Sequence, residues 1–234
     1  MNIKTQYISL SVSDGTTMQA YTALPESEGP FPGLIVFQEA FGVNSFMREV
    51  TERFAKEGFV AISPELFHRT APPGFEGSYT DFNAIAPHFQ GMTAEGSEAD
   101  ITAAYNWLSS QSMVKKDHIC TTGYCLGGRM SFLANCILPF RSTVAYYGGG
   151  IAAQLSQRTS ELHAPILFFW GGLDKHIPHE QVEQVIQELK KAEKPYMNVE
   201  ISYADHGFFN HEKPAYSVKA AAEAWPLTLA FLRQ

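Results

Sequence analysis

The sequence predicts an α/β fold with a mostly parallel central sheet, helices on both faces and an N-terminal antiparallel hairpin. Short apolar segments alternate with helical patterns from residue 33 onward, which is typical of such a sheet. The chain has 234 residues, of which 45% are hydrophobic, so it is long enough for a large buried core. We therefore expect a single domain over residues 1–234.

The chain opens with a predicted hairpin. Segments 6–12 and 18–24 are joined through Ser-Asp-Gly at 13–15, and Asp-Gly is a strong turn signal. The later strands are predicted from short apolar runs at 34–37, 60–63, 119–122, 143–147, 166–170 and 199–203.

Two helices follow from apolar periodicity and from their end signals. The helix predicted over 45–57 has its apolar side chains on one stripe and is followed by Gly58, a residue type suited to the position after a helix. The last helix is predicted over 214–232, packed on the sheet. Segment 64–96 has many prolines, glycines and aromatic residues and no clear period. A connection of this length is often functional, so we expect it over the mouth of the site, with an irregular surface excursion as the alternative for its distal half.

A G-x-C-x-G pentad at 123–127 lies between a predicted strand and a helical segment. This context is typical of a nucleophile elbow, here with Cys125 in the place where serine is more common. Gly123, Gly127 and Gly128 would let the strand and the helix approach closely and expose the thiol. The alternative is that Cys125 is a small buried side chain in a glycine-rich turn.

The other cysteines and the paired histidines do not suggest a disulfide or a metal site. Cys120 and Cys136 lie inside a strand and a helix, where a thiol packs in the core, and the chain has no C-x-x-C pair. His176 and His179 lack a third ligand at metal spacing. We expect structural cysteines, no zinc and a reducing compartment.

A thiol nucleophile needs a base and a group that orients the base. Asp174 follows the strand at 166–170, and His206 follows the next strand along the chain. Because the carboxyl ends of parallel strands meet at one edge of the sheet, we expect Cys125, Asp174 and His206 to converge there. Asp205 is the rival for the acid, and the alternative for Asp174 is a helix cap.

Composition disfavours several classes of partner. The formal net charge is −7 and no Lys/Arg cluster occurs, which argues against nucleic acid and anionic membranes. The N-terminus lacks the apolar run of a signal peptide, and no segment approaches the roughly 18 to 20 apolar residues that span a bilayer. We expect a cytoplasmic protein, with a monomer as the default.

These motifs, in this order, resemble those of the dienelactone hydrolase family, which has the α/β-hydrolase fold with the chain order nucleophile, acid, histidine. Besides the elbow, the matching segments are 37–44, 64–69, 172–174 and 206–208, and the similarity runs over nearly the whole chain. The resemblance implies a carboxylic ester hydrolase (carboxymethylenebutenolidase-like) that acts on a small ester or lactone without a cofactor.

The resemblance also implies roles for further residues. Glu39 matches a glutamate that helps to deprotonate the thiol of Cys125 when substrate displaces it, with a surface acid as the alternative. Arg69 matches an arginine that binds the substrate carboxylate, with a solvated loop arginine as the alternative. The backbone N–H groups of Leu126 and Ala40 are expected to hold the oxyanion.

The sequence departs from the family pattern after the catalytic histidine. No second arginine occurs in 208–213, and Lys213 offers only a compact ammonium in its place, so native activity on dienelactone is not implied.

The expected reaction is acyl transfer through a thioester on Cys125, with His206 as acid and base and Asp174 fixing its tautomer. Aromatic side chains are candidates for an apolar substrate wall, with core packing as the alternative: Tyr124, Trp170 and Phe208. A thioesterase or peptidase would use the same triad. A ligand-binding or redox-sensing module would not need an aligned acid and histidine.

Overall fold

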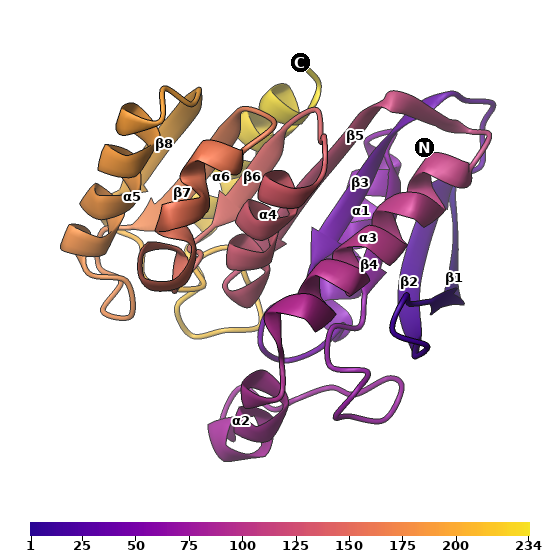
Figure 1. The fold of residues 1–234 in the computed structure, drawn as a ribbon, viewed down its shortest axis with the longest axis horizontal. Coiled ribbons are helices and arrows are strands. Elements are labelled where there is room, and N and C mark those ends of the chain that lie inside the picture. Colours follow the sequence, from indigo (N-terminus) through magenta and orange to yellow (C-terminus); the bar gives the residue numbers. More distant parts are fainter. The chain divides into compact units, whose positions relative to one another are not determined.

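The computed structural model describes all residues of the chain, 1–234. The chain divides into two compact units, Met1–Cys120 and Thr121–Gln234. Eight strands pair in the order β1-β2-β4-β3-β5-β6-β7-β8, and strand β5 (Val114–Tyr124) contributes residues to both units (Figure 1). The predicted α/β class, with a mostly parallel sheet and an antiparallel N-terminal hairpin, is confirmed.

The first unit contains the predicted hairpin. Strands β1 (Ile3–Ser11) and β2 (Thr17–Pro25) pair antiparallel from end to end. At the turn Gly15 has φ +85°, a value that favours glycine, and the Asp14 carboxylate accepts from the backbone N–H of Thr16 at 3.0 Å. Strand β1 begins at Ile3 rather than at 6 and ends at Ser11 rather than at 12, and β2 extends beyond the predicted segment at both ends.

The hairpin joins a parallel pair. Strand β2 runs antiparallel to β4 (Val60–Pro64), and β4 runs parallel to β3 (Phe31–Phe37). Helix α1 (Ser45–Lys56) packs on β2 and β4, and its side chains Phe46, Val50 and Phe54 are at most 1% exposed, as the apolar stripe predicts. Gly58 follows with φ +90°, so its predicted role at the end of this helix is confirmed.

Segment 64–96 is more regular than predicted. It contains helix α2 (Phe82–Gln90), which begins where the Asp81 side chain accepts from the backbone N–H of Ala84 at 3.2 Å. Of the α2 side chains only Ile85 is buried, so no apolar stripe marks the helix in the sequence.

Helix α3 (Ala94–Ser110) was also not predicted. It packs on β3 and β4. The buried face of its first half carries the polar residues Ser97 and Asp100 beside Ile101, which weakens the apolar period in the sequence.

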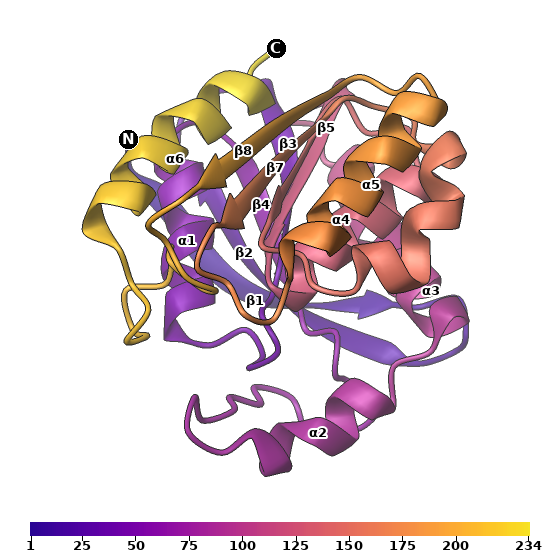
Figure 2. The same ribbon diagram turned by 90° about the vertical axis from the view of Figure 1, so that its left-hand side faces the viewer.

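The second unit is a parallel sheet with helices on both faces. From β5 the order continues through β6 (Thr143–Tyr146), β7 (Ile166–Gly171) and β8 (Tyr196–Ile201), all paired in parallel. Figure 2 shows helices α4 (Leu126–Ile137) and α5 (His179–Lys191) on one face of these strands and α6 (Val218–Leu232) on the other.

The predicted end of strand β8 and the predicted start of helix α6 were wrong. Strand β8 ends at Ile201 rather than at 203, because the Ile201 carbonyl accepts from the backbone N–H groups of Gly172 and Ala204 and the chain turns there. Helix α6 begins at 218 rather than 214, where the Ser217 hydroxyl oxygen accepts from the backbone N–H of Ala220. Between β6 and β7 lie a short π-helix (Ile151–Leu155) and a 3-10 helix (Ser156–Glu161).

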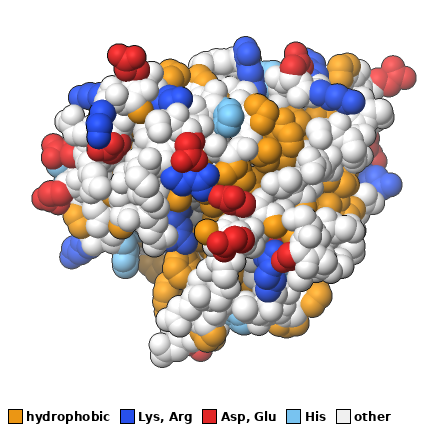
Figure 3. Space-filling model, viewed as in Figure 1, with side chains coloured by type: hydrophobic (Ala, Val, Ile, Leu, Met, Phe, Trp, Pro, Cys, Tyr) orange, Lys and Arg blue, Asp and Glu red, His pale blue; other side chains and the backbone are white.

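The inner strands β3, β4, β6 and β7 are largely buried, whereas most residues of the edge strands β1 and β8 are exposed or half-buried. Cys120 and Cys136 are 0% and 4% exposed, so both thiols pack in the core as predicted. On the face drawn in Figure 3, Lys and Arg side chains are interspersed with Asp and Glu. No helix is long and apolar enough to cross a membrane.

Candidate active site

Cys125 occupies a strained turn between β5 and α4. Its backbone has φ 56° and ψ −112°, an arrangement that costs a non-glycine residue about 1–3 kcal/mol and is concentrated at functional sites. The turn is held by the Cys125 N–H, which donates to the Tyr146 carbonyl at 3.0 Å, and by the Cys125 carbonyl, which accepts from the N–H of Gly128 at 3.0 Å. The surrounding hydrogen bonds thus stabilise the strained backbone.

Glycines permit this turn for steric reasons. A Cβ on Gly123 would lie 2.2 Å from the carbonyl oxygen of Gly127, and a Cβ on Gly128 would lie 2.5 Å from that of Tyr146. Neither contact is possible for a real side chain, so the strand and the helix approach this closely only with glycine. This agrees with the steric role expected for the elbow glycines.

Asp174 lies in the loop after β7 and contacts the imidazole of His206. Its Oδ2 is 2.7 Å from His206 Nδ1, and its Oδ1 accepts from the backbone N–H groups of His176 and Ile177 at 2.8 and 3.2 Å. The Asp174 side chain is only 1% exposed. Asp205 instead accepts from the backbone N–H of His206 at 2.7 Å. The carboxylate that orients the ring is therefore that of Asp174.

His206 contacts Cys125 as well as Asp174. Burial lowers the pKa of His206, but hydrogen bonds to Asp174 and to the thiolate of Cys125, together with their negative charges, raise it to about 10. Because Nδ1 is engaged by Asp174, Nε2 is the nitrogen that remains for the sulfur. The structure thus brings together the three residues expected to converge, all within the second unit.

Leu126 is the first residue of α4, directly after Cys125. The first N–H groups of a helix have no partner within the helix and lie at the positive end of its dipole. The backbone N–H of Leu126 is therefore suited to binding an oxyanion.

Sequence reasoning missed Arg129, which lies one helical turn after Cys125. Its half-buried guanidinium donates from Nη1 to the side-chain oxygen of Gln154 at 2.9 Å. Burial lowers the pKa of Arg129, while the negative charge of Cys125 raises it. The spacing of four residues along a helix was the signal that could have found it.

Glu39 and Ala40 follow strand β3 in the first unit. Glu39 is 0% exposed, so it is not the surface acid that was the alternative, and Ala40 is 3% exposed. The Gln38 side chain donates to the Glu39 carbonyl at 3.2 Å and accepts from the backbone N–H of Leu66 at 3.0 Å, which holds this loop against the end of β4.

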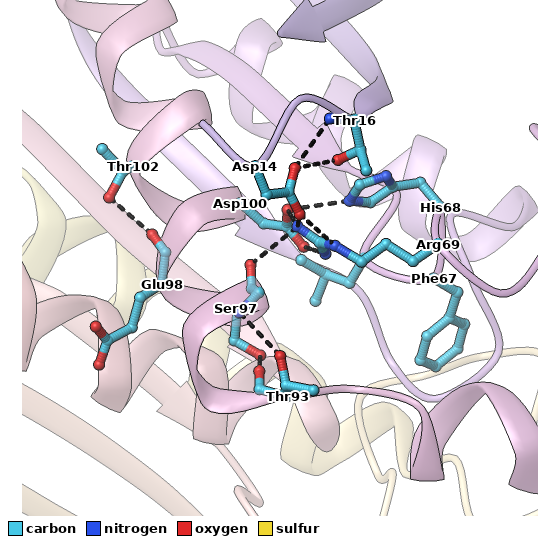
Figure 4. Close-up of polar contacts among 12 residues, drawn as sticks. Asp14, Thr16, Phe67, His68, Arg69, Thr93, Ser97, Glu98, Asp100 and Thr102 are labelled. Carbon is cyan, nitrogen blue, oxygen red and sulfur yellow. Dashed lines mark hydrogen bonds and ion pairs between the residues drawn. The ribbon is translucent and has the colours of Figure 1, made fainter. Parts of the chain in front are cut away.

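Arg69 is bound by carboxylates of the chain itself (Figure 4). Its Nη1 and Nη2 donate to the two oxygens of Asp100 at 2.8 and 2.9 Å, and its Nε donates to Asp14 at 2.8 Å. Asp100 is 1% exposed and also contacts His68 Nε2 at 3.0 Å. These contacts tie the loop after β4 to α3 and to the hairpin turn. A substrate-binding role for Arg69 stays a prediction.

The three aromatic side chains that are candidates for the substrate wall are buried. Tyr124 and Phe208 are 0% exposed, and Trp170 is 2% exposed. Tyr124 stacks on Tyr146 with ring centroids 4.7 Å apart, and Trp170 donates its indole N–H to the Asn198 side chain at 2.7 Å. This burial agrees with core packing, the alternative given for these residues, and a substrate-binding role for them stays a prediction.

Lys213, the possible substitute for the second arginine, lies over the glycine that follows His206. Its Cδ is 3.1 Å from the place where a Cβ on Gly207 would stand, and Gly207 has φ +80°. The stem of Lys213 therefore covers the backbone of this loop.

Comparison with known proteins gives a match over nearly the whole chain. The model of the "Dienelactone hydrolase family" matches residues 18–234. A Synechocystis sp. protein named "Putative carboxymethylenebutenolidase" is 33% identical over 96% of this chain and 94% of its own length. The "Carboxymethylenebutenolidase" of Pseudomonas putida is 32% identical over 97% of this chain and 96% of its own.

The comparison with solved structures also finds a dienelactone hydrolase. The "Putative Dienelactone Hydrolase" from Klebsiella pneumoniae has a TM-score of 0.91 at 30% identity, with all of both chains covered. An acylaminoacyl peptidase of Pyrococcus horikoshii has a TM-score of 0.76 at 14% identity, and 42% of its chain is covered, a likeness of fold alone.

Proposed function

The chain belongs to the dienelactone hydrolase family and is a hydrolase, and we propose that it cleaves a small ester or lactone through Cys125, His206 and Asp174 by way of a thioester. One observation carries this proposal: His206 is hydrogen-bonded to Asp174 at 2.7 Å and also to a cysteine that stands at φ 56° between a strand and a helix. A buried thiol without a catalytic role requires neither the strained turn nor the oriented imidazole.

The first half-reaction forms the thioester. The thiolate of Cys125 attacks the carbonyl carbon, and the carbonyl electron pair moves to oxygen, where the N–H of Leu126 donates a hydrogen bond. Collapse of this intermediate breaks the bond to the leaving oxygen, which takes a proton from Nε2 of His206. The acyl group is then bound to Cys125 as a thioester, and the leaving group is free as an alcohol or, for a lactone, is the hydroxyl end of the opened chain.

The second half-reaction releases the acid. Nε2 of His206, now neutral, takes a proton from water as the water oxygen attacks the thioester carbon. The sulfur leaves as thiolate and the imidazolium is restored, so protons balance over the cycle. Asp174 holds Nδ1–H throughout and stabilises the imidazolium, in keeping with the raised pKa of His206.

Two further roles rest on the family match. The backbone N–H of Ala40 is proposed as the second oxyanion donor, and Glu39 as the carboxylate that helps to take the thiol proton when substrate binds. The complete burial of Glu39 supports a specific role, since a buried carboxylate is costly unless it is bound by polar groups.

The test is hydrolysis of dienelactone and of p-nitrophenyl esters of increasing chain length by the wild type and by Cys125→Ala. We expect the substitution to lower turnover by at least about 10⁴-fold, because nucleophile and base act as a unit. Thermal unfolding should remain nearly unchanged. Cys136→Ala is the matched control, because that thiol is buried in the core and its loss should leave turnover intact.

Mass spectrometry of the quenched reaction should find the acyl group on Cys125. Full turnover by Cys125→Ala, or no turnover of any ester by the wild type, would refute the proposal. Hydrolysis of thioesters or peptides in place of oxygen esters would favour the alternative enzyme class on the same triad.

A further inference from the structure

We propose that Gln38 is a positioning residue whose side-chain amide orients the peptide between Glu39 and Ala40, so that the Ala40 N–H is held ready for the oxyanion. This inference rests on the proposed function, in which that N–H is the second oxyanion donor. Gln38 follows directly after β3 and is completely buried. Burial of a polar side chain is costly unless its polar atoms are hydrogen-bonded, so the partners of Gln38 indicate its role.

The first partner of Gln38 is the carbonyl of Glu39. Nε2 of Gln38 donates to this oxygen at 3.2 Å. The Glu39 carbonyl and the Ala40 N–H belong to one planar peptide unit, and in a trans peptide they point in opposite directions. A hydrogen bond that holds the carbonyl therefore directs the N–H away from the glutamine. A peptide turned by half a rotation would present its oxygen to the oxyanion in place of the N–H, and the two negative oxygens would repel each other.

The second partner of Gln38 anchors it to the neighbouring strand. Oε1 of Gln38 accepts from the backbone N–H of Leu66 at 3.0 Å, two residues after the end of β4. Strands β3 and β4 pair in parallel, so the segments that follow them leave the same edge of the sheet. An amide carries a donor and an acceptor at its two ends, whereas a carboxylate of the same shape carries acceptors alone. Glutamine therefore fits between one carbonyl and one N–H.

The rest of the loop after β3 is held by segment 75–77. The Phe41 carbonyl accepts from the backbone N–H of Gly77 at 2.9 Å. Gly42 has φ +81°, and a Cβ there would collide with the carbonyl oxygen of Phe75, so the two backbones touch at a place where only glycine fits. The Ala40 N–H therefore lies between two carbonyls that are both hydrogen-bonded. A donor that is fixed in advance stabilises an oxyanion without the cost of reorganisation.

The test compares two reactions of the Cys125 sulfur, of which only one forms an oxyanion. With trifluoromethyl butyl ketone the thiolate adds to the carbonyl carbon, the carbonyl electron pair moves to the oxygen and nothing leaves. With iodoacetamide a carbon–sulfur bond forms at the thiolate and iodide leaves, without any oxyanion. A change in the amount of thiolate affects both reactions by the same factor. The ketone affinity from fluorine NMR, divided by the alkylation rate, therefore reports stabilisation of the oxyanion and requires no ester turnover.

Replacement of Gln38 should lower this ratio. Gln38→Met removes the donor and the acceptor at nearly constant size, and Gln38→Glu removes the donor but keeps an acceptor for Leu66. We expect the ratio of ketone affinity to alkylation rate to fall by about tenfold to a hundredfold in both variants, less than for the outright loss of an oxyanion donor. Gln38→Glu provides the test if Gln38→Met does not fold, and thermal unfolding shows which variants are folded.

Asn135 is the matched control, because it is also a completely buried amide that bridges backbone groups. Its Nδ2 donates to the Ala164 carbonyl at 3.0 Å, and its Oδ1 accepts from the Ala164 N–H at 2.8 Å. Asn135→Leu and Asn135→Asp should lower the temperature of unfolding and leave the ratio at the wild-type value. An equal fall of the ratio in the Asn135 and Gln38 variants would show a general loosening of the fold and would overturn the positioning role.

Steady-state kinetics give a second readout. On p-nitrophenyl hexanoate, kcat and kcat/KM should fall together in the Gln38 variants, because the oxyanion develops only in the transition state. An unchanged ratio in a folded Gln38 variant would overturn the positioning role, while Cys125-dependent hydrolysis by the wild type would keep the proposed function. A lowered ratio without any ester hydrolysis by the wild type would keep the positioning role and overturn the proposed function.

Discussion

Asp174 Oδ2 lies 2.7 Å from His206 Nδ1 although 32 positions separate the two residues in the chain. The contact arises because β7 and β8 are neighbouring parallel strands whose last pair is Gly171 and Ile201. The loops after them leave the same edge of the sheet and lie close together: a Cβ on Gly171 would stand 2.6 Å from the carbonyl oxygen of Ala204. Glycine at this strand end therefore lets the acid reach the histidine.

Replacement of Asp174 by Asn should impair catalysis far more than folding. Asn keeps an oxygen for the backbone N–H groups of His176 and Ile177 but removes the charge that stabilises the imidazolium. We expect kcat to fall by about 10³- to 10⁴-fold. Asp205→Asn is the control, because Asp205 contacts only the backbone N–H of His206 among these groups. Equal losses in the two variants would contradict the assignment of the acid.

Stability should fall as the pH rises from neutral to alkaline because of His206. Its pKa is raised from 6.5 to about 10 in the folded chain by Asp174 and Cys125. Below pH 6.5 the ring is protonated in the folded and the unfolded states, so the stabilisation is complete; toward pH 10 it is lost as the folded protein releases the proton.

Urea unfolding of the wild type and Asp174→Asn across this pH range measures the effect. Because the substitution removes one cause of the raised pKa, the variant should lose less stability than the wild type between the two ends of the range. Parallel curves for the two proteins would show that other groups account for the fall.

Gly123→Ala should prevent correct folding, because its methyl group would lie 2.2 Å from the carbonyl oxygen of Gly127 and neither backbone can move without breaking the elbow. We expect a loss of at least about 3 kcal/mol or an insoluble protein. Gly149→Ala is the matched control in the same unit: its nearest neighbour would be Ile177 at 3.8 Å, and the effect should stay within about 1 kcal/mol. Thermal unfolding of the soluble variants provides the comparison.

Arg69→Gln should lower stability, since it removes the cation from Asp100, whose side chain is 1% exposed. We expect a loss on the order of 3 kcal/mol in urea unfolding, as for other broken buried pairs. Arg158→Gln removes a more exposed ion pair with Glu161 and should cost less than about 1 kcal/mol. A higher KM for carboxylate-bearing esters with unchanged stability would instead support the substrate-binding role predicted for Arg69.

The sequence predicted the parts of the fold that have a strong local signal. Apolar runs identified the strands, and one apolar stripe with a following glycine identified α1. Helices α2 and α3 were missed because their buried faces are short or polar, and the start of α6 was misplaced because the capping residue is Ser217. Local pattern is informative only where burial follows a regular period.

By itself, the sequence determined the family motifs and predicted which residues carry the chemistry: a cysteine in a glycine-flanked turn, followed in order by an acid and a histidine at strand ends. Only the tertiary structure decided which groups meet. It pairs Asp174 rather than Asp205 with the ring of His206, and it pairs the guanidinium of Arg69 with Asp100. Strand pairing and the positions of the helices determine the distances between these side chains. The periodicity of the sequence carries no information about those distances.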